Sequence, residues 1–230
     1  MIRLDKCIAD LGLGSRKDAK KWIKEKRVYV NGELALKDDF KVAEGDEIVI
    51  DEEVFIYHEF VYILLNKPQG VVSATEDREC ATVIDLIEDT TKGLFPVGRL
   101  DKDTVGLCFI TNDGQLAHQL LSNKKHVEKE YVLIAEHALS DKDIRRIEEG
   151  ITIDGDEQCL PAKIFKSDEL EYHMIIQEGK YHQVKRMLEA IDNKVMFLQR
   201  IRMKNLMLDE ALELGEWRYL TKEEIEKLKR

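Results

Sequence analysis

Charged side chains gather in one short stretch, residues 97–107, directly before an apolar run at residues 107–110. The apolar run is typical of a buried strand, so the charged residues are expected in a loop at its mouth. Loops braced by a rigid strand are frequent locations of catalytic side chains. Asp101 lies between two cations in this loop, which favour its carboxylate form and keep it available as a nucleophile or a base. Asp103 is a rival with the same chemistry, and an ordinary solvated turn is the alternative interpretation.

Several other kinds of catalysis lack their residue patterns in this chain. The sequence has no glycine-rich phosphate loop, no cluster of metal ligands and no plausible Ser/His/Asp set. These absences argue against nucleotide hydrolysis and zinc-dependent deamination. The four cysteines are far apart in sequence, which indicates thiols rather than a zinc site or a disulfide framework. We therefore expect neither a metal nor a cofactor.

The composition is that of a globular protein with a heavily charged surface. Of 230 residues, 43% are hydrophobic and 36% are charged, and no stretch approaches the roughly 18 unbroken apolar residues of a membrane span. The start of the chain lacks the apolar core of a signal peptide, so we expect a cytoplasmic protein without a membrane partner. The net charge of −10 argues against nucleic-acid binding, yet residues 3–37 hold ten basic and five acidic side chains. This asymmetry indicates a basic recognition module on an acidic body.

The basic module contains two predicted helices and a small sheet. Apolar spacing predicts a helix over residues 4–11, and Ser15 with Asp18 forms a capping box that begins a second helix. Strands are predicted at 28–30, 33–36 and 47–50, with a tight turn at Asn31-Gly32. One face of the second helix is basic and nearly free of acids, and can bind phosphates in a salt-dependent way, although a solvated surface is the alternative. Its basic residues are Arg16, Lys17, Lys20, Lys21, Lys24 and Arg27.

Three segments of this module carry a family resemblance. Residues 3–5 (Arg-Leu-Asp), 14–16 (Gly-Ser-Arg) and 28–32 (Val-Tyr-Val-Asn-Gly) resemble the RNA-binding domain named after ribosomal protein S-four. The resemblance implies a domain over residues 1–56 that binds structured RNA through the basic helix and the hairpin loop. Residues 51–59 are interpreted as a short connection to a second domain at residues 60–230.

The body is predicted to contain more strands than helices. A capping box at Ser140 and Asp143 begins one helix, which ends at Gly150. Hairpins and return strands dominate over strand–helix–strand units, which favours an α+β fold with a mostly antiparallel sheet flanked by helices. Strands are expected at residues 61–66, 131–135, 170–176 and 195–198, and further helices at residues 82–87, 115–121, 180–188 and 222–230.

Four segments of the body resemble the RsuA-type pseudouridine synthases, which modify small-subunit ribosomal RNA, and their large-subunit relatives. The segments are residues 66–71, 98–107, 129–131 and 179–187, and they occur in the family's order. The resemblance implies the pseudouridine synthase fold and an enzyme that isomerises one uridine of ribosomal RNA, expected in the small subunit. Large-subunit RNA with the same chemistry, and a ribosome-associated RNA-binding protein without catalysis, are the alternatives.

The resemblance also implies roles for individual residues. Asp101 acts at the ribose of a uridine that has been flipped out of the RNA, either attacking C1′ or removing the C2′ proton. Tyr131 stacks on the base, Lys185 pairs with Asp101, and Arg99 fills the gap left in the RNA. The product is an isomer, so no cofactor or metal is needed, and a monomer acting on ribosomal RNA or a ribosome assembly intermediate is expected. Further RNA contacts are expected from Lys67, Lys180, His182, Gln183 and Arg186.

Overall fold

The computed structural model describes residues 1–122 and 125–230, which form two compact units. The first unit contains Met1–Val61 together with Glu88–Leu94, and the second contains Tyr62–Ile87 together with Phe95–Arg230. The return of Glu88–Leu94 to the first unit has no signal in the sequence. It is held there by the Thr90 hydroxyl, which donates to the Leu11 carbonyl at 2.7 Å, and by the Lys92 amide, which donates to the Asp10 carbonyl at 2.8 Å.

The first unit packs two helices against a four-stranded sheet in the order β3-β2-β5-β6. The capping box of Ser15 and Asp18 begins α2 as predicted, and its side chains Ala19 and Ile23 are buried. The elements are β1 (Ile2–Arg3), α1 (Leu4–Asp10), α2 (Arg16–Lys24), β2 (Val28–Val30), β3 (Glu33–Leu34), β4 (Lys41–Val42), β5 (Glu47–Ile50) and β6 (Glu53–Ile56).

The strand β6 corrects the interpretation of residues 51–59 as a connection. It pairs antiparallel with β5 and therefore belongs to the sheet of the first unit. The two residues between these strands, Asp51 and Glu52, both have positive φ angles, 50° and 75°. Tight hairpin turns need this backbone conformation, which glycine or asparagine usually signals. Neither residue type is present here, so the turn was not recognised.

The second unit is built on one mixed sheet in the order β13-β14-β10-β15-β9-β7-β17. Every neighbouring pair is antiparallel except β15 and β9, which confirms the predicted α+β fold with a mostly antiparallel sheet. The elements are β7 (Tyr62–Lys67), β8 (Phe95–Pro96), β9 (Val105–Thr111), α3 (Gly114–Leu121), β10 (Lys129–Ala135), α4 (Asp141–Glu148), β11 (Thr152–Ile153), β12 (Glu157–Gln158), β13 (Lys163–Lys166), β14 (Glu171–Ile176), α5 (Gln183–Glu189), β15 (Val195–Met203), β16 (Leu206–Met207), β17 (Trp217–Tyr219) and α6 (Lys222–Lys229).

Three predicted elements of the second unit need correction. Residues 82–87 are not helical: Thr82 and Asp85 form the hydrogen bonds of a capping box, but the chain continues in a turn instead of a helix. Helix α5 begins at Gln183 rather than Lys180, because His182 has a left-handed backbone with φ of 47°. Strand β15 continues to Met203, well past the predicted end at residue 198.

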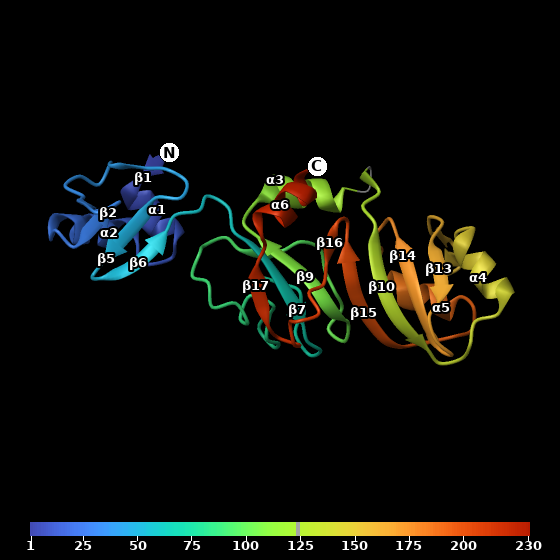
Figure 1. The fold of residues 1–230 in the computed structure, drawn as a ribbon. Coiled ribbons are helices and arrows are strands. Elements are labelled where there is room, and N and C mark those ends of the chain that lie inside the picture. The colour runs from blue at the N-terminus through green and yellow to red at the C-terminus, as the bar shows by residue number, and fades with distance from the viewer. Residues whose placement is uncertain (123–124) are drawn as a thin grey trace. The chain divides into compact units, whose positions relative to one another are not determined.

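One narrow joint holds the two halves of this sheet together. Only two residue pairs link β15 to β9, Gln199 with Val105 and Arg200 with Gly106, and Figure 1 shows β7, β9 and β17 on one side of this joint and β10, β13 and β14 on the other. A Cβ atom on Gly106 would lie 2.3 Å from the Arg200 carbonyl oxygen. The buried Arg200 side chain extends the joint, since its Nε donates to the Leu107 carbonyl at 2.8 Å.

None of the helices in the described part of the chain has the length and apolar character that crossing a membrane requires.

The close approach at Gly106 predicts a large difference between two glycine substitutions. Gly106 and Gly215 have nearly equal φ angles, 97° and 96°, but a Cβ at Gly215 would meet nothing within 4 Å. Gly215→Ala should cost only the backbone strain, about 1–2 kcal/mol, whereas Gly106→Ala should cost about 1–3 kcal/mol more because the strands must move apart. Urea unfolding followed by Trp217 fluorescence, in a Trp22→Phe background, measures this difference. Equal unfolding midpoints for the two variants would contradict the close approach.

Candidate active site

Asp101 lies in the loop that leads into β9, and two residues of the segment 182–185 face its carboxylate. Lys185 Nζ lies 3.0 Å from Asp101 Oδ2, and His182 Nε2 lies 3.4 Å from Asp101 Oδ1. The Asp101 side chain is 24% exposed, so a substrate can reach it. The loop itself is closed by the Thr104 amide, which donates to the Asp101 carbonyl at 3.1 Å. The structure therefore places the predicted pair, Asp101 and Lys185, in direct contact.

The ammonium of Lys185 contacts both rival carboxylates. Its Nζ lies 2.6 Å from Asp103 Oδ1, so the two acids share one cation. Burial disfavours the charged form of Lys185, but hydrogen bonds to Asp103 and Asp101 outweigh burial and raise its pKa above the ordinary value. The hydrogen bond from Lys185 also lowers the pKa of Asp103. The acids differ in exposure, since the Asp103 side chain is 69% exposed and is solvated more than Asp101.

Lys67 lies beneath the Asp101 loop and not on the surface, which corrects its predicted role as an RNA contact. Its side chain is fully buried, and Nζ donates to the carbonyl oxygens of Pro68 at 3.0 Å, Thr104 at 2.9 Å and Lys102 at 3.4 Å. Burial lowers the pKa of Lys67 to about 8. An ammonium carries three N–H groups; two of them donate to the loop after Asp101, at Lys102 and Thr104, and the third donates to Pro68 of the segment after β7.

Two further residues of the segment after β7 support the same loop. The Ser73 hydroxyl donates to the Leu100 carbonyl and accepts from the Leu100 amide, both at 3.0 Å. The Gly70 amide donates to the Lys102 carbonyl at 2.8 Å. Sequence reasoning missed Ser73, because nothing local to residue 73 indicates a partner 27 positions later. Together these contacts fix the backbone on both sides of Asp101.

Tyr131 lies on β10 with its side chain buried on the inner face of the sheet. It stands directly opposite Arg200 of β15, and Lys129 lies two residues before it on the same face of the strand. Both cations are buried, and burial lowers the pKa of Lys129 to about 8. Arg200 Nη2 has no hydrogen-bond partner within residues 1–122 and 125–230. The sheet face that carries Tyr131 therefore also carries two buried positive charges, Lys129 and Arg200. Sequence patterns do not indicate that these two cations lie on one face.

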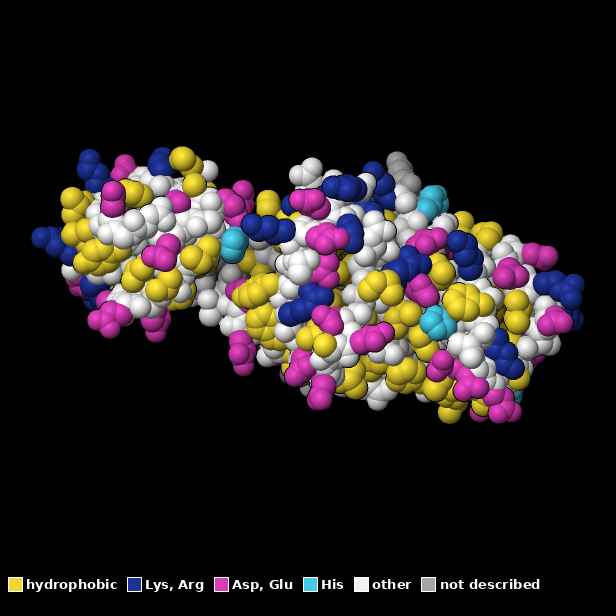
Figure 2. Space-filling view, in the orientation of Figure 1, with side chains coloured by type: hydrophobic (Ala, Val, Ile, Leu, Met, Phe, Trp, Pro, Cys, Tyr) yellow, Lys and Arg dark blue, Asp and Glu magenta, His cyan; other side chains and the backbone are white. Residues whose placement is uncertain are grey.

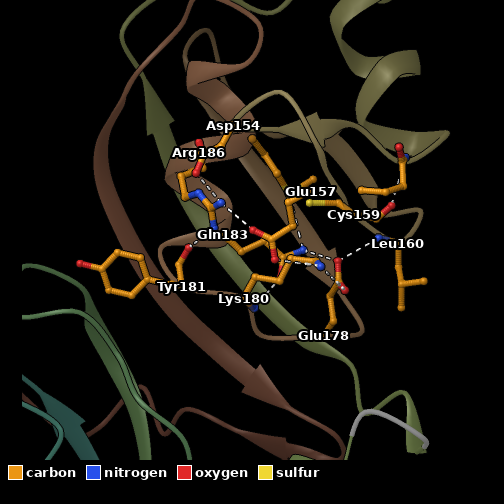
Figure 3. Close-up of polar contacts among 11 residues, drawn as sticks. Asp154, Glu157, Cys159, Leu160, Glu178, Lys180, Tyr181, Gln183 and Arg186 are labelled. Atoms are coloured by element: carbon orange, nitrogen blue, oxygen red, sulfur yellow. Dashed lines mark hydrogen bonds and ion pairs between the residues drawn. The ribbon is translucent and has the colours of Figure 1, made fainter.

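Three predicted RNA contacts in residues 179–187 bind acidic side chains of the second unit instead (Figure 3). Lys180 Nζ lies 3.1 Å from Glu157, and Arg186 contacts both Glu157 at 2.6 Å and Asp154 at 2.5 Å. Gln183 is buried, and its Nε2 donates to Glu178 at 2.8 Å. These contacts stiffen the segment, and the buried Gln183 cannot contact RNA in this conformation. These pairings were not predictable from sequence patterns, because Asp154 and Glu157 come from the region of β11 and β12.

The basic face of α2 is also partly neutralised. Arg16 Nη2 lies 2.8 Å from the buried carboxylate of Asp5, and Lys20 Nζ lies 3.1 Å from Asp38. The hydrogen bond from Arg3 lowers the pKa of Asp5 to about 2. Within the described residues, no acid pairs with the exposed side chains that remain on this face, which are Lys17, Lys21 and Lys24. Arg99 of the second unit is likewise exposed, and no ion pair joins it to another described residue.

The rest of the surface adds no broad basic field on the face that Figure 2 shows. Acidic and basic side chains are interspersed over the visible face of the second unit in that view. In the described parts of the chain, no group of three or more His, Cys, Asp and Glu side chains is arranged to hold a metal ion.

The chain is similar to known proteins over nearly its whole length. The chain matches the RNA pseudouridylate synthase family over residues 61–190 and the S4 domain over residues 2–48. It is 45% identical to an uncharacterized RNA pseudouridine synthase of Bacillus subtilis, with 97% of each chain covered. It is 40% identical to ribosomal small subunit pseudouridine synthase A of Haemophilus influenzae, with 99% of each covered. A solved structure described as a crystal structure of pseudouridylate synthase is 38% identical, with a TM-score of 0.70 over 99% of this chain and 100% of that chain.

The burial of Lys67 predicts a loss of stability without a loss of RNA affinity. Lys67→Met leaves three carbonyl oxygens around Nζ without their donor, which should lower the free energy of unfolding by about 1–3 kcal/mol. The slope of log RNA affinity against log salt concentration should not change. Lys24→Met, which removes an exposed lysine, is the control and should reduce that slope by nearly one. A slope that falls by about one in Lys67→Met, with unchanged stability, would restore Lys67 as an RNA contact.

Proposed function

The chain belongs to the RNA pseudouridylate synthase family and carries an S4 domain at its N-terminus, and from this premise we propose that it isomerises a uridine of small-subunit ribosomal RNA to pseudouridine. The full-length relative of Haemophilus influenzae is named for action on the small subunit, at 40% identity. The observation that carries the proposal is the contact of a solvent-accessible carboxylate, Asp101, with the partly buried ammonium of Lys185, at 3.0 Å.

The proposed reaction moves one glycosidic bond and needs no redox partner. The uridine is first flipped out of the RNA, at a cost of a few kcal/mol. The C1′–N1 bond breaks, the uracil rotates, and a C1′–C5 bond forms. The proton lost from C5 is balanced by the proton gained at N1, so the product has the composition of the substrate. Asp101 acts at the ribose as nucleophile towards C1′ or as base towards the C2′ proton, and either route fits its exposure.

The other proposed catalytic residues hold and balance charge. Lys185 acts as the fixed cation that orients the Asp101 carboxylate. Tyr131 stacks on the flipped base, and it lies on the face that carries the buried cations Lys129 and Arg200. Positive charge fixed in a buried site stabilises negative charge on a departing uracil more strongly than it would in water. Arg99, which is exposed, fills the position that the flipped base leaves.

The first unit is proposed to bind the RNA around the target. The exposed lysines of α2 attract phosphates, and Lys20 and Arg16 keep the helix in place through Asp38 and Asp5. We further propose a monomer that acts in the cytoplasm on ribosomal RNA or on an assembly intermediate. Large-subunit RNA as the target and a non-catalytic RNA-binding role are not favoured, because of the small-subunit name of the relative and the intact Asp101–Lys185 pair.

The catalytic assignment predicts opposite outcomes for two matched substitutions. Asp101→Asn and Asp103→Asn each remove one negative charge that contacts Lys185. Asp101→Asn should lower the rate of pseudouridine formation at least about 100-fold, because the group that acts at the ribose is gone. Asp103→Asn should stay within about tenfold of the wild-type rate, since Asp103 only shares the cation. Single-turnover assays on ribosomal RNA measure both rates, and an active Asp101→Asn beside an inactive Asp103→Asn would reverse the assignment.

The role of α2 predicts a salt-dependent loss of RNA binding. Reversing Lys17, Lys21 and Lys24 to Glu should weaken binding and reduce the slope of log affinity against log salt by about two to three. The control reverses three exposed lysines of the second unit to Glu, with the same change in net charge; these are Lys142, Lys166 and Lys194. Filter binding across a salt series measures both slopes. The same slope change in both triple variants would mean that net charge, and not α2, governs binding.

A further inference from the structure

Tyr181 presents an aromatic ring to solvent beside the Asp101 site, and the catalytic proposal gives it no role. Its side chain is 76% exposed. One face of the ring stacks on His182, with the ring centroids 3.8 Å apart and the planes 18° apart. We propose that the free face of Tyr181 binds the nucleobase that neighbours the target uridine in the RNA. This inference rests on the proposed function and names a second contact of the same substrate.

The position of Tyr181 follows from that of His182. His182 Nε2 lies 3.4 Å from Asp101, so one imidazole ring separates the Tyr181 ring from the catalytic carboxylate. A uridine whose ribose contacts Asp101 has its neighbours one nucleotide away along the strand. The free face of Tyr181 is an exposed flat surface beside the site on which such a neighbour can stack.

The backbone that carries Tyr181 is held in place while its side chain is left free. The Tyr181 carbonyl accepts from Arg186 Nη1 at 2.8 Å, and Arg186 is itself fixed by Asp154 and Glu157. Figure 3 shows the ring pointing away from this polar cluster. His182 has a φ of 47°, and non-glycine residues in sparsely populated backbone regions cost free energy and cluster at binding and active sites. The left-handed backbone of His182 therefore costs stability, and it presents the rings of Tyr181 and His182 together.

Nucleobase stacking explains such a surface better than packing within the protein. Flipping a uridine breaks its stacking on both neighbours, so a neighbouring base has an uncovered face. Stacking of a base on an aromatic side chain is largely independent of base identity, because every base has a π-face. Tyr131 is already assigned to the flipped uracil, and it is buried while Tyr181 is exposed. Tyr131 thus stacks on the flipped base, and Tyr181 stacks on its neighbour.

The test uses a stem-loop of small-subunit ribosomal RNA that carries the mapped target uridine, with 2-aminopurine in place of each neighbouring nucleotide in turn. Stacking on an aromatic ring quenches 2-aminopurine fluorescence. At one of the two positions, wild type and Tyr181→Phe should quench the probe, and Tyr181→Ala should not. Tyr181→Ala should also weaken RNA binding by about 5- to 150-fold, while its rate at saturating RNA stays within a few-fold of wild type.

Phe165 supplies a matched control, because it is also an exposed aromatic residue stacked on a histidine, His173, with the ring centroids 4.9 Å apart. Phe165→Ala should leave quenching and affinity unchanged. Tyr181→Ala that behaves like Phe165→Ala would overturn the subsite, and so would a fall in rate at saturating RNA with quenching retained, which would mean that Tyr181 only positions His182. A wild-type protein that forms no pseudouridine would instead refute the proposed function and remove the subsite with it.

Discussion

The close approach of β9 and β15 at Gly106 is the constraint on which the proposed active site depends. Asp101 belongs to the loop before β9, whereas Lys185, His182 and Tyr131 belong to the half of the sheet on the other side of the joint. Two residue pairs and the Arg200 side chain form that joint. An ion pair at 3.0 Å tolerates little displacement. The distance between Asp101 and Lys185 therefore depends on the contact between β9 and β15 at Gly106, where only a glycine fits.

A second theme is that many cations of this acidic protein serve its own structure. Arg186 and Lys180 bind Glu157, Arg16 binds Asp5, and Lys67 binds carbonyl oxygens under the Asp101 loop. Each of these contacts fixes the backbone near a functional element, which precise geometry requires. The predicted RNA contacts that are exposed and have no ion pair among the described residues are therefore fewer than the sequence suggests: Lys17, Lys21, Lys24 and Arg99. In the proposed function, RNA recognition uses this exposed subset, and a net charge of −10 is then compatible with RNA binding.

Much of the fold was predictable because it depends on local patterns. The capping boxes at Ser15 and Ser140 begin helices as expected, and the apolar run at residues 107–110 lies within a fully buried strand. The errors arose where partners distant in sequence decide the outcome. The residues next to Lys67 in sequence do not indicate its hydrogen bond to the Thr104 carbonyl. Those next to Arg186 do not indicate its contacts with Asp154 and Glu157. The turn at Asp51 and Glu52 is not signalled by the sequence because Glu52, at a positive φ, stands where glycine is usual. The contact of Asp101 with Lys185 was anticipated through family resemblance, since 84 residues separate them in the chain.

Pseudouridine mapping of ribosomal RNA from cells with and without the gene tests the central claim most directly. Loss of the gene should remove pseudouridine at one position of the small-subunit RNA. Expression of the wild-type protein should restore that modification, and expression of Asp101→Asn should not. An unchanged small-subunit map, or a position lost from large-subunit RNA instead, would contradict the proposed target. Restoration by Asp101→Asn would contradict the catalytic role of the carboxylate that the sheet joint holds against Lys185.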